Sequence, residues 1–282
     1  ATIAREARGP VHISHFNTPA ERAIPRMDRD RAAGIEMTFD MYPYLAGSSI
    51  LAMVALPPWV QEGGNAATIE RLRDPGVRER LGDWFKNPEY AHKDLKLTAI
   101  AAPKFRHLEG KMLLDAAASA DKPVGEFICD VLVASELMVG IVHFHRKRTE
   151  ADIREMMRHP AHMAGSDGIL VGGVPHPRGW GAFAKYLGPY VRDGKIWSIE
   201  EAVRHCSSHA AERFGLNDRG RIQAGMAADI VSFDPNRLVD LATFEHGRKL
   251  ATGVEHVLVN GKVVLRAGER TKETPGRGLR RM

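Results

Sequence analysis

The chain has 282 residues, 44% of them hydrophobic, which is enough to bury the core of one large domain or of a domain with a smaller companion. No run approaches the roughly 20 apolar residues of a membrane span, and the N-terminus lacks a signal-peptide pattern, so we expect a cytoplasmic protein without membrane contact. The net charge is +5, but basic and acidic residues are mixed and only the tail from Arg266 to Arg281 concentrates positive charge. We therefore expect no nucleic-acid partner.

The first 48 residues predict a strand, a helix and a second strand. "GPVHISHF" is a short buried strand ending near His15, residues 19–33 form a helix that stops at Gly34, and "IEMTFDMYPY" is the next strand. Connections this short favour a βαβ unit with parallel strands. His15, Tyr42 and Tyr44 should then lie on one rim of the sheet, where α/β enzymes place their chemistry.

Residues 49–138 change character, with short helical pieces broken by prolines and no clear alternation of apolar and polar positions. We expect an insertion or lid here. "VGIVHF", residues 139–144, is a strand by composition, and "TEADIREMMRH" is a helix with a capping box formed by Thr149 and Asp152. The two cysteines, Cys129 and Cys206, lack any paired spacing and are expected to be buried thiols.

A short strand, "AHMAG", leads into Ser166-Asp167-Gly168 and a loop rich in glycine and proline. Ser198 and Glu201 form another capping box and open a helix that should run to about Phe214 and stop at Gly215. After Leu216 the pattern indicates strands, with "HVLVNGKVVL" forming a hairpin, because Asn-Gly suits the positive φ of a type I′ turn.

Four polar residues stand out near the predicted strand ends. Asp167 fits an ordinary Asp-Gly turn, but at the end of a strand it also suits a catalytic acid/base. His176 and Arg178 follow in its loop and fit either a substrate contact or a structural clasp. His15 fits a metal ligand or a satisfied rim histidine, and an alternative metal pair is His143 with His145, which share one face of a strand.

A family resemblance rests on the segments "VHISHFN", "TFDMYPYLAGSS", "LPPWVQEGG", "GSDG" followed by "PHPRGWGAF", "EEAVRHCSSHAAERFGLNDRGRIQAGMAADIVSFDP" and "HVLVNGKVV". In this order, and over nearly the whole chain, they resemble the C-terminal half of the N-acyl-D-amino-acid deacylases (D-aminoacylases) of the amidohydrolase superfamily. The similarity is weakest between about residues 65 and 140.

The resemblance implies a partial TIM-like (β/α)₈ barrel with zinc at its rim and a small β-sandwich. His15 matches the metal histidine of the sixth strand, and Asp167 matches the aspartate of the eighth, a zinc ligand and general acid/base. The substrate-binding residues that it implies are Arg178, Tyr42, Tyr44, Asn17, Ser48 and His176. The expected domains are a barrel βαβ unit at 1–48, the insertion at 49–138, the last barrel βα units with the catalytic loop at 139–215, and a sandwich piece with a basic tail at 216–282.

Two departures from the family pattern matter. The family usually has a lysine two residues after the sixth-strand histidine, whereas this chain has Asn17, so a cationic contact to substrate is lost or replaced. The family's first-strand HxH, its cysteine ligand and its fifth-strand histidine would precede Ala1, which is itself within a helical pattern. We therefore expect the missing barrel half to be supplied in cis or as a separate chain.

The expected function is zinc-dependent hydrolysis of the amide bond of N-acyl-D-amino acids by the complete polypeptide, while these 282 residues alone should be inactive. Two alternatives stay open: a catalytically inactive fragment or partner subunit, and a different amidohydrolase that acts on cyclic-imide or D-glutamate-type substrates.

Overall fold

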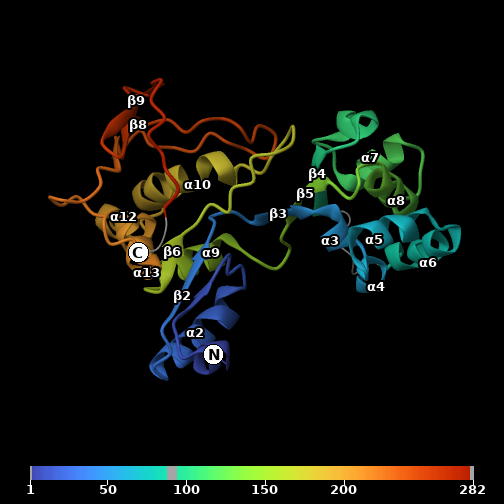
Figure 1. Cartoon of the computed structure of the whole chain (residues 1–282), viewed down its shortest axis with the longest axis horizontal. Coiled ribbons are helices and arrows are strands. Elements are labelled where there is room, and N and C mark those ends of the chain that lie inside the picture. The colour runs from blue at the N-terminus through green and yellow to red at the C-terminus, as the bar shows by residue number, and fades with distance from the viewer. Residues whose placement is uncertain (1, 88–93, 280–282) are drawn as a thin grey trace.

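The computed structural model describes residues 2–87 and 94–279 and shows a mixed α/β fold (Figure 1). Ala1 and the end of the basic tail, residues 280–282, lie outside the described residues. Within the described residues the strands form three sheets, one parallel and two antiparallel. No helix in 2–87 or 94–279 is long and apolar enough to cross a membrane.

The parallel sheet has three strands in the order β1-β2-β6. Its strands are β1 (Val11–Ile13), β2 (Met37–Met41) and β6 (His162–Ala164). Helix α2 (Ala20–Ala32) connects the first two strands and packs apolar residues under the sheet, so the predicted βαβ unit is confirmed. Gly34, with φ of 79°, ends the turn after α2.

Further helices accompany the parallel sheet. All but the first and the last of them contribute side chains to its apolar core, which residues such as Phe39 and Tyr186 fill. They are α1 (Thr2–Ala7), α9 (Glu150–Arg158), α10 (Arg178–Leu187), α11 (Pro189–Arg192), α12 (Ile199–Cys206) and α13 (Ser208–Phe214). The capping box at Thr149 is present. The single helix expected from Ser198 to Phe214 is instead two, because Ser207 leaves helical geometry at φ −139° and ψ −88°.

An antiparallel sheet and its helices form a second unit, drawn to the right in Figure 1. Its elements are β3 (Ala46–Ile50), α3 (Leu51–Ala55), α4 (Pro58–Gln61), α5 (Gly64–Arg73), α6 (Pro75–Phe85), β4 (Leu95–Ile100), a 3₁₀ helix (Pro103–Leu108), α7 (Leu113–Ser119), α8 (Val124–Ala134) and β5 (Val139–Phe144). A separate core, drawn from residues 51–141, holds this unit together and includes the fully buried thiol of Cys129. We call this sheet together with its helices, residues 46–144, the insertion unit.

β5 pairs with strands of the insertion unit, whereas the sequence pattern assigns residues 139–144 to the last barrel βα units. The strand "VGIVHF" forms as predicted, but it bonds antiparallel to β3 and β4 and so belongs to the insertion unit. The physical reason is the burial of Val139 and Ile141 against the second core. Because Ala46 pairs with Phe144, the chain enters and leaves the insertion unit through neighbouring residues.

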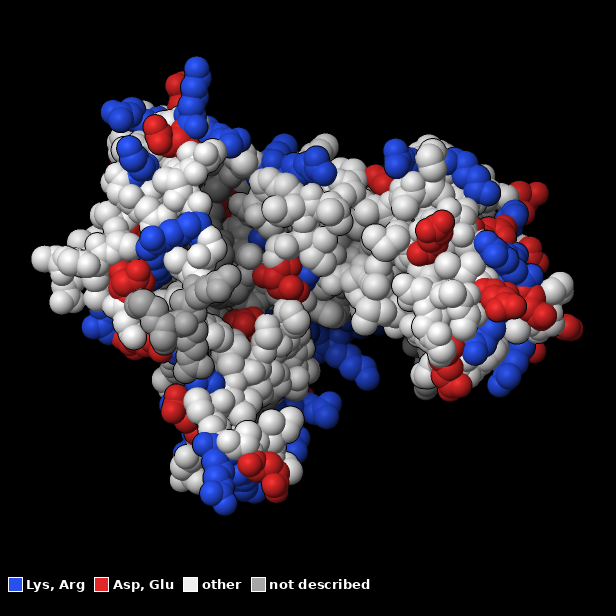
Figure 2. All heavy atoms as spheres, viewed as in Figure 1, with Lys and Arg blue, Asp and Glu red and all other residues white. Residues whose placement is uncertain are grey.

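The C-terminal segment forms a four-stranded antiparallel sheet in the order β10-β9-β8-β7. Its strands are β7 (Ile230–Phe233), β8 (Val254–Val259), β9 (Lys262–Arg266) and β10 (Glu269–Arg270). Asn260 and Gly261 join β8 to β9 with φ of 47° and 76°, as the Asn-Gly turn predicts. Lys, Arg, Asp and Glu side chains are interspersed over the face of the molecule shown in Figure 2.

Candidate functional site

His15 and Asp167 meet at the carboxyl ends of two strands. β1 and β6 both bond to β2, and each residue lies in the loop that follows its strand. The His15 Nε2 atom lies 3.3 Å from Asp167 Oδ1, and both side chains are partly exposed, at 48% and 32%. Both residues have positive φ, 40° and 45°, which is uncommon for residues with a side chain and is concentrated at functional turns.

Asp40 on β2 positions the His15 loop and was missed by the sequence analysis. Its Oδ1 accepts a hydrogen bond from the His15 backbone N–H at 2.9 Å, and its Oδ2 contacts His12 Nε2 at 2.8 Å. Burial raises the pKa of Asp40, but the contacts with His12 and with the His15 backbone outweigh it and lower that pKa overall. The alternation of "TFDM" placed Asp40 on a strand, but only the sheet shows which loop it supports.

Arg178 is the first residue of α10 and is almost fully buried, at 1% exposed. Its Nη2 lies 2.7 Å from Asp167 Oδ2, and its guanidinium stacks on the Tyr42 ring at 4.4 Å. Burial lowers the pKa of Arg178, and Asp167 and Tyr42 oppose that shift. The arrangement brings the predicted acid/base, the predicted clamp and one predicted tyrosine together.

His176 is a structural clasp in this arrangement. Its Nε2 donates to the carbonyl of Ala46 at 2.9 Å, and its Nδ1 accepts from the backbone N–H of Arg178 at 3.0 Å. Burial lowers the pKa of His176 to about 3, so the ring is neutral at physiological pH. Since both ring nitrogens are engaged, His176 has no free nitrogen for the substrate contact that was expected, and it instead fixes the start of α10 to β3.

The two predicted tyrosines, Tyr42 and Tyr44, make different contacts. Tyr42 faces Arg178, whereas the Tyr44 hydroxyl donates to Asp240 Oδ2 at 3.4 Å and its ring lies under Lys185. Burial raises the pKa of both phenols. Tyr42 is therefore the tyrosine that joins the site, while Tyr44 ties α10 to the C-terminal segment.

Asn17 joins the site through a residue that the sequence analysis overlooked. Its Oδ1 accepts a hydrogen bond from Arg148 Nη1 at 2.6 Å. Arg148 is 5% exposed although it ends the basic run "HRKR", which predicts a solvated loop. Ser48 lies on β3 opposite Val142, within the insertion unit.

The Asp167 loop packs on the insertion unit. The backbone N–H of Gly173 donates to Glu109 Oε2 at 2.7 Å, and that of Val174 donates to the Thr98 carbonyl at 3.3 Å. Gly172 has φ of 89°, and a Cβ there would lie 2.2 Å from the Thr98 oxygen, so only glycine fits. The insertion unit thus shapes the loop that carries Asp167.

The donor atoms of His15 and Asp167 are of the kinds that zinc prefers, but they are two, and a catalytic zinc site has three protein ligands and a water. Across residues 2–87 and 94–279, no group of three or more His, Cys, Asp or Glu side chains could hold a metal ion. His143 and His145 lie 5.5 Å apart by ring centroid on β5, with no third donor grouped with them in that same part of the chain.

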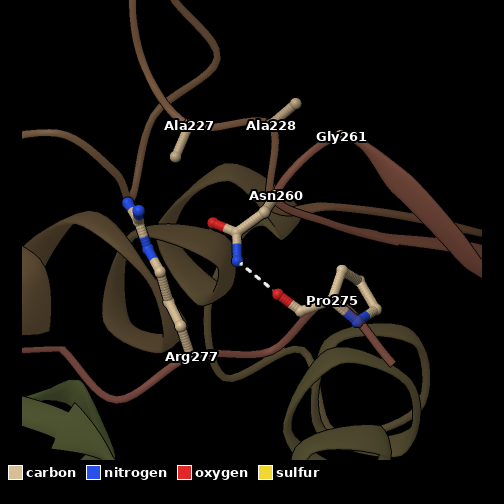
Figure 3. A pocket seen from close by; sticks show the side chains of 6 residues that line it. All are labelled: Ala227, Ala228, Asn260, Gly261, Pro275 and Arg277. Carbon is tan, nitrogen blue, oxygen red and sulfur yellow. Dashed lines mark hydrogen bonds between the residues drawn. The ribbon is translucent and has the colours of Figure 1, made fainter. Parts of the chain in front are cut away.

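A cavity of about 480 Å³ lies beside the C-terminal hairpin, where Asn260 Nδ2 donates to the Pro275 carbonyl at 2.8 Å (Figure 3). Its lining residues are Ala227, Ala228, Asn260, Gly261, Pro275 and Arg277. Arg277 is the one ionisable side chain among them. This cavity therefore lacks the acid/base groups that gather around Asp167.

Comparison with known proteins gave consistent matches. Residues 107–265 match the family model described as amidohydrolase family. The chain is 31% identical over 260 residues to an N-acyl-D-glutamate deacylase of Alcaligenes xylosoxydans xylosoxydans, covering 92% of this chain and 44% of that protein. It is also 31% identical over 288 residues to a D-aminoacylase of the same organism, covering 99% of this chain and 50% of that protein.

Among solved structures, the chain is similar to N-acyl-D-glutamate deacylase from Bordetella bronchiseptica, complexed with zinc and a phosphonate inhibitor that mimics the tetrahedral intermediate. The TM-score is 0.71 at 28% identity, over 93% of this chain and 48% of that one. The chain spans about half the length of the curated relatives it matches.

Proposed function

The chain belongs to the amidohydrolase family, and from that premise we propose that the complete protein hydrolyses the amide bond of N-acyl-D-amino acids with zinc. Support comes from the identity with two curated deacylases and from the structural likeness to a zinc-containing deacylase. The observation that carries the proposal is the meeting of His15 and Asp167, which follow the parallel strands β1 and β6 on either side of β2, with Arg178 at the start of α10.

We propose that the β1-β2-β6 sheet is part of a TIM-like barrel and that the C-terminal sheet is part of a small β-sandwich. The insertion unit acts as the lid, since the Asp167 loop packs against it through Glu109 and Thr98. The two-donor set at His15 and Asp167 is completed by residues supplied from the rest of the protein, in cis or from a separate chain.

Each side chain has a defined task in this proposal. Bound zinc would supply a Lewis acid and lower the pKa of its water, with His15 and Asp167 among the residues that hold it. Asp167 takes the proton of the attacking water and passes it to the leaving amine as the C–N bond breaks. Arg178 binds the substrate carboxylate, and Tyr42 donates to the oxygen that becomes negative.

The test is an assay of the complete gene product with N-acetyl-D- and N-acetyl-L-amino acids, before and after a chelator. We expect turnover of D-substrates only, lost with the metal, and no zinc-dependent turnover by the 282 residues alone. Asp167→Asn should lower kcat about 100- to 10,000-fold, the usual range for a general acid/base.

Asp193→Asn removes the same charge from an exposed aspartate and is the matched control, since it should leave kcat unchanged. An Asp167→Asn protein with wild-type kcat would rule out the assigned role. The second candidate function is a non-catalytic subunit, and the presence of only two metal donors among the described residues of this chain supports it. A complete protein that binds zinc but cleaves no acyl-amino acid would favour this candidate. A preference for cyclic imides would favour another amidohydrolase chemistry.

A further inference from the structure

Arg148 is a buried cation whose direct contacts in the described part of the chain are all neutral. Nη1 donates to Asn17 Oδ1 at 2.6 Å and to the Tyr44 carbonyl at 3.4 Å, and Nη2 lies 3.7 Å from the Met41 sulfur. Its Nε is buried without a hydrogen-bond partner among the described residues. Burial lowers the pKa of Arg148, which reflects the cost of holding a charge there.

The carboxylate of Asp152 acts on Arg148 only through space. Its two oxygens are used by Thr149 and by the backbone N–H of Ala20, at 2.7 and 2.9 Å. A desolvated guanidinium without a paired anion is strongly unfavourable, because its hydration is lost and not replaced. An anion that binds beside Asn17 would complete these contacts.

Arg148 and Arg178 are two cations near one phenol. Arg178 stacks on Tyr42 and pairs with Asp167, whereas Arg148 bonds to Asn17 and acts on the Tyr42 hydroxyl through space. Both guanidiniums lower the pKa of the Tyr42 hydroxyl, against the larger effect of burial. Arg178 already has the Asp167 carboxylate as its partner, whereas Arg148 contacts no carboxylate among the described residues.

We propose that Arg148 binds a second carboxylate of the substrate, so that the preferred substrates are N-acyl derivatives of D-glutamate or D-aspartate. This rests on the proposed function. The α-carboxylate is one carbon from the amide nitrogen and belongs beside Arg178, which touches Asp167 directly. The side-chain carboxylate lies farther from the scissile bond and would bind Arg148, which makes no contact with Asp167 among the described residues and whose guanidinium Asn17 orients.

The geometry also accounts for Asn17 at a position where the resemblance leads one to expect a lysine. The amide cannot supply charge, but its oxygen holds the guanidinium that does. The cation thus comes from the loop before α9 and not from the loop after β1.

Binding to the complete, chelator-treated protein by isothermal titration tests the inference independently of turnover. We expect wild-type protein to bind N-acetyl-D-glutamate more tightly than N-acetyl-D-leucine. Arg148→Gln should raise the Kd for N-acetyl-D-glutamate roughly 10- to 100-fold, as for a lost charge-assisted contact. The Kd for N-acetyl-D-leucine should rise less than about threefold. Arg146→Gln, which removes the same charge from an exposed neighbour paired with Asp94, is the control and should change neither.

The double variant Arg148→Gln with Asn17→Lys should recover N-acetyl-D-glutamate binding to within about threefold of wild type, since an ammonium then replaces the guanidinium. This rescue separates a charge effect from misfolding. Equal weakening of both ligands, or a wild-type protein that binds both equally, would overturn the inference. Wild-type binding without turnover would instead count against the proposed function alone.

Discussion

At the scale of single residues, His176 shows how burial converts a titratable group into a structural one. The ring is 1% exposed, and both nitrogens bond to the backbone on either side of the site. Protonation would place a hydrogen on Nδ1, where it would face the N–H of Arg178. The folded protein therefore resists protonation of this histidine.

This resistance predicts acid sensitivity. The pKa of His176 is about 3 in the folded protein and 6.5 ordinarily, so the unfolded chain takes up a proton first as the pH falls below 6.5. Stability is complete above pH 6.5 and is lost as the pH falls, by about 1.4 kcal/mol at pH 5.5 from this residue. Urea unfolding at pH 7.5 and 5.5 measures the fall in unfolding free energy between these two pH values. This fall should be smaller for His176→Gln than for the wild-type protein. Equal losses would contradict the assignment.

At the scale of elements, Asp152 joins two helices. It completes the capping box of α9 with Thr149 and also accepts from the backbone N–H of Ala20, where α2 begins. The two helices cover the same face of the parallel sheet, since both contribute to its core. One carboxylate thus fixes the relative position of two elements that are 132 residues apart in sequence.

Asp152→Ala should cost roughly 2 kcal/mol of unfolding free energy, about 1 for the cap and a similar amount for the unsatisfied N–H of Ala20. Chemical denaturation measures it. Glu155→Ala changes an exposed acidic residue of the same helix and should stay within about 0.5 kcal/mol of wild type. Similar losses in the two variants would argue against the bridging role.

The sequence predicts some of these elements and not others, for physical reasons. The βαβ unit, the capping box and the Asn-Gly hairpin follow from local chemistry and are confirmed. β3 was missed because "AGSSI" is made of small residues apart from Ile50 and has no aromatic residue, and its pairing with β5 supplies the stability. Arg148 was missed because burial of a basic loop residue depends on tertiary packing that no spacing encodes.

At the scale of the whole molecule, the described chain has two large and separate hydrophobic cores. The core of the parallel sheet comes from residues 20–41 and 153–196, and that of the insertion unit from residues 51–141. The insertion unit contacts the rest of the described chain through polar groups and single rings, such as the Lys96 Nζ bond to the Phe244 carbonyl at 2.9 Å and the packing of Phe144 on Phe244. Because the insertion unit has its own core, we expect it to be a separate folding unit.

Expressed alone, residues 45–145 should therefore fold and unfold in one cooperative transition, because the core of this segment is internal to it. Thermal unfolding followed by circular dichroism would measure this. Phe144→Ala should change that transition little in the isolated segment, but should destabilise the complete protein, where the ring packs on Phe244. A broad, non-cooperative melt of the segment would show that it needs the parallel sheet.

Ala46 and Phe144 are paired neighbours, which bears on how the insertion unit can be exchanged during evolution. A segment whose two ends are hydrogen-bonded neighbours can be exchanged between genes without resetting the register of the sheet that receives it. His15 and the β1-β2-β6 sheet would keep their places while Thr98 and Glu109, which hold the loop after β6, were replaced. Such an exchange would let lineages inherit new substrate ranges while the hydrolytic residues stayed under separate, slower selection.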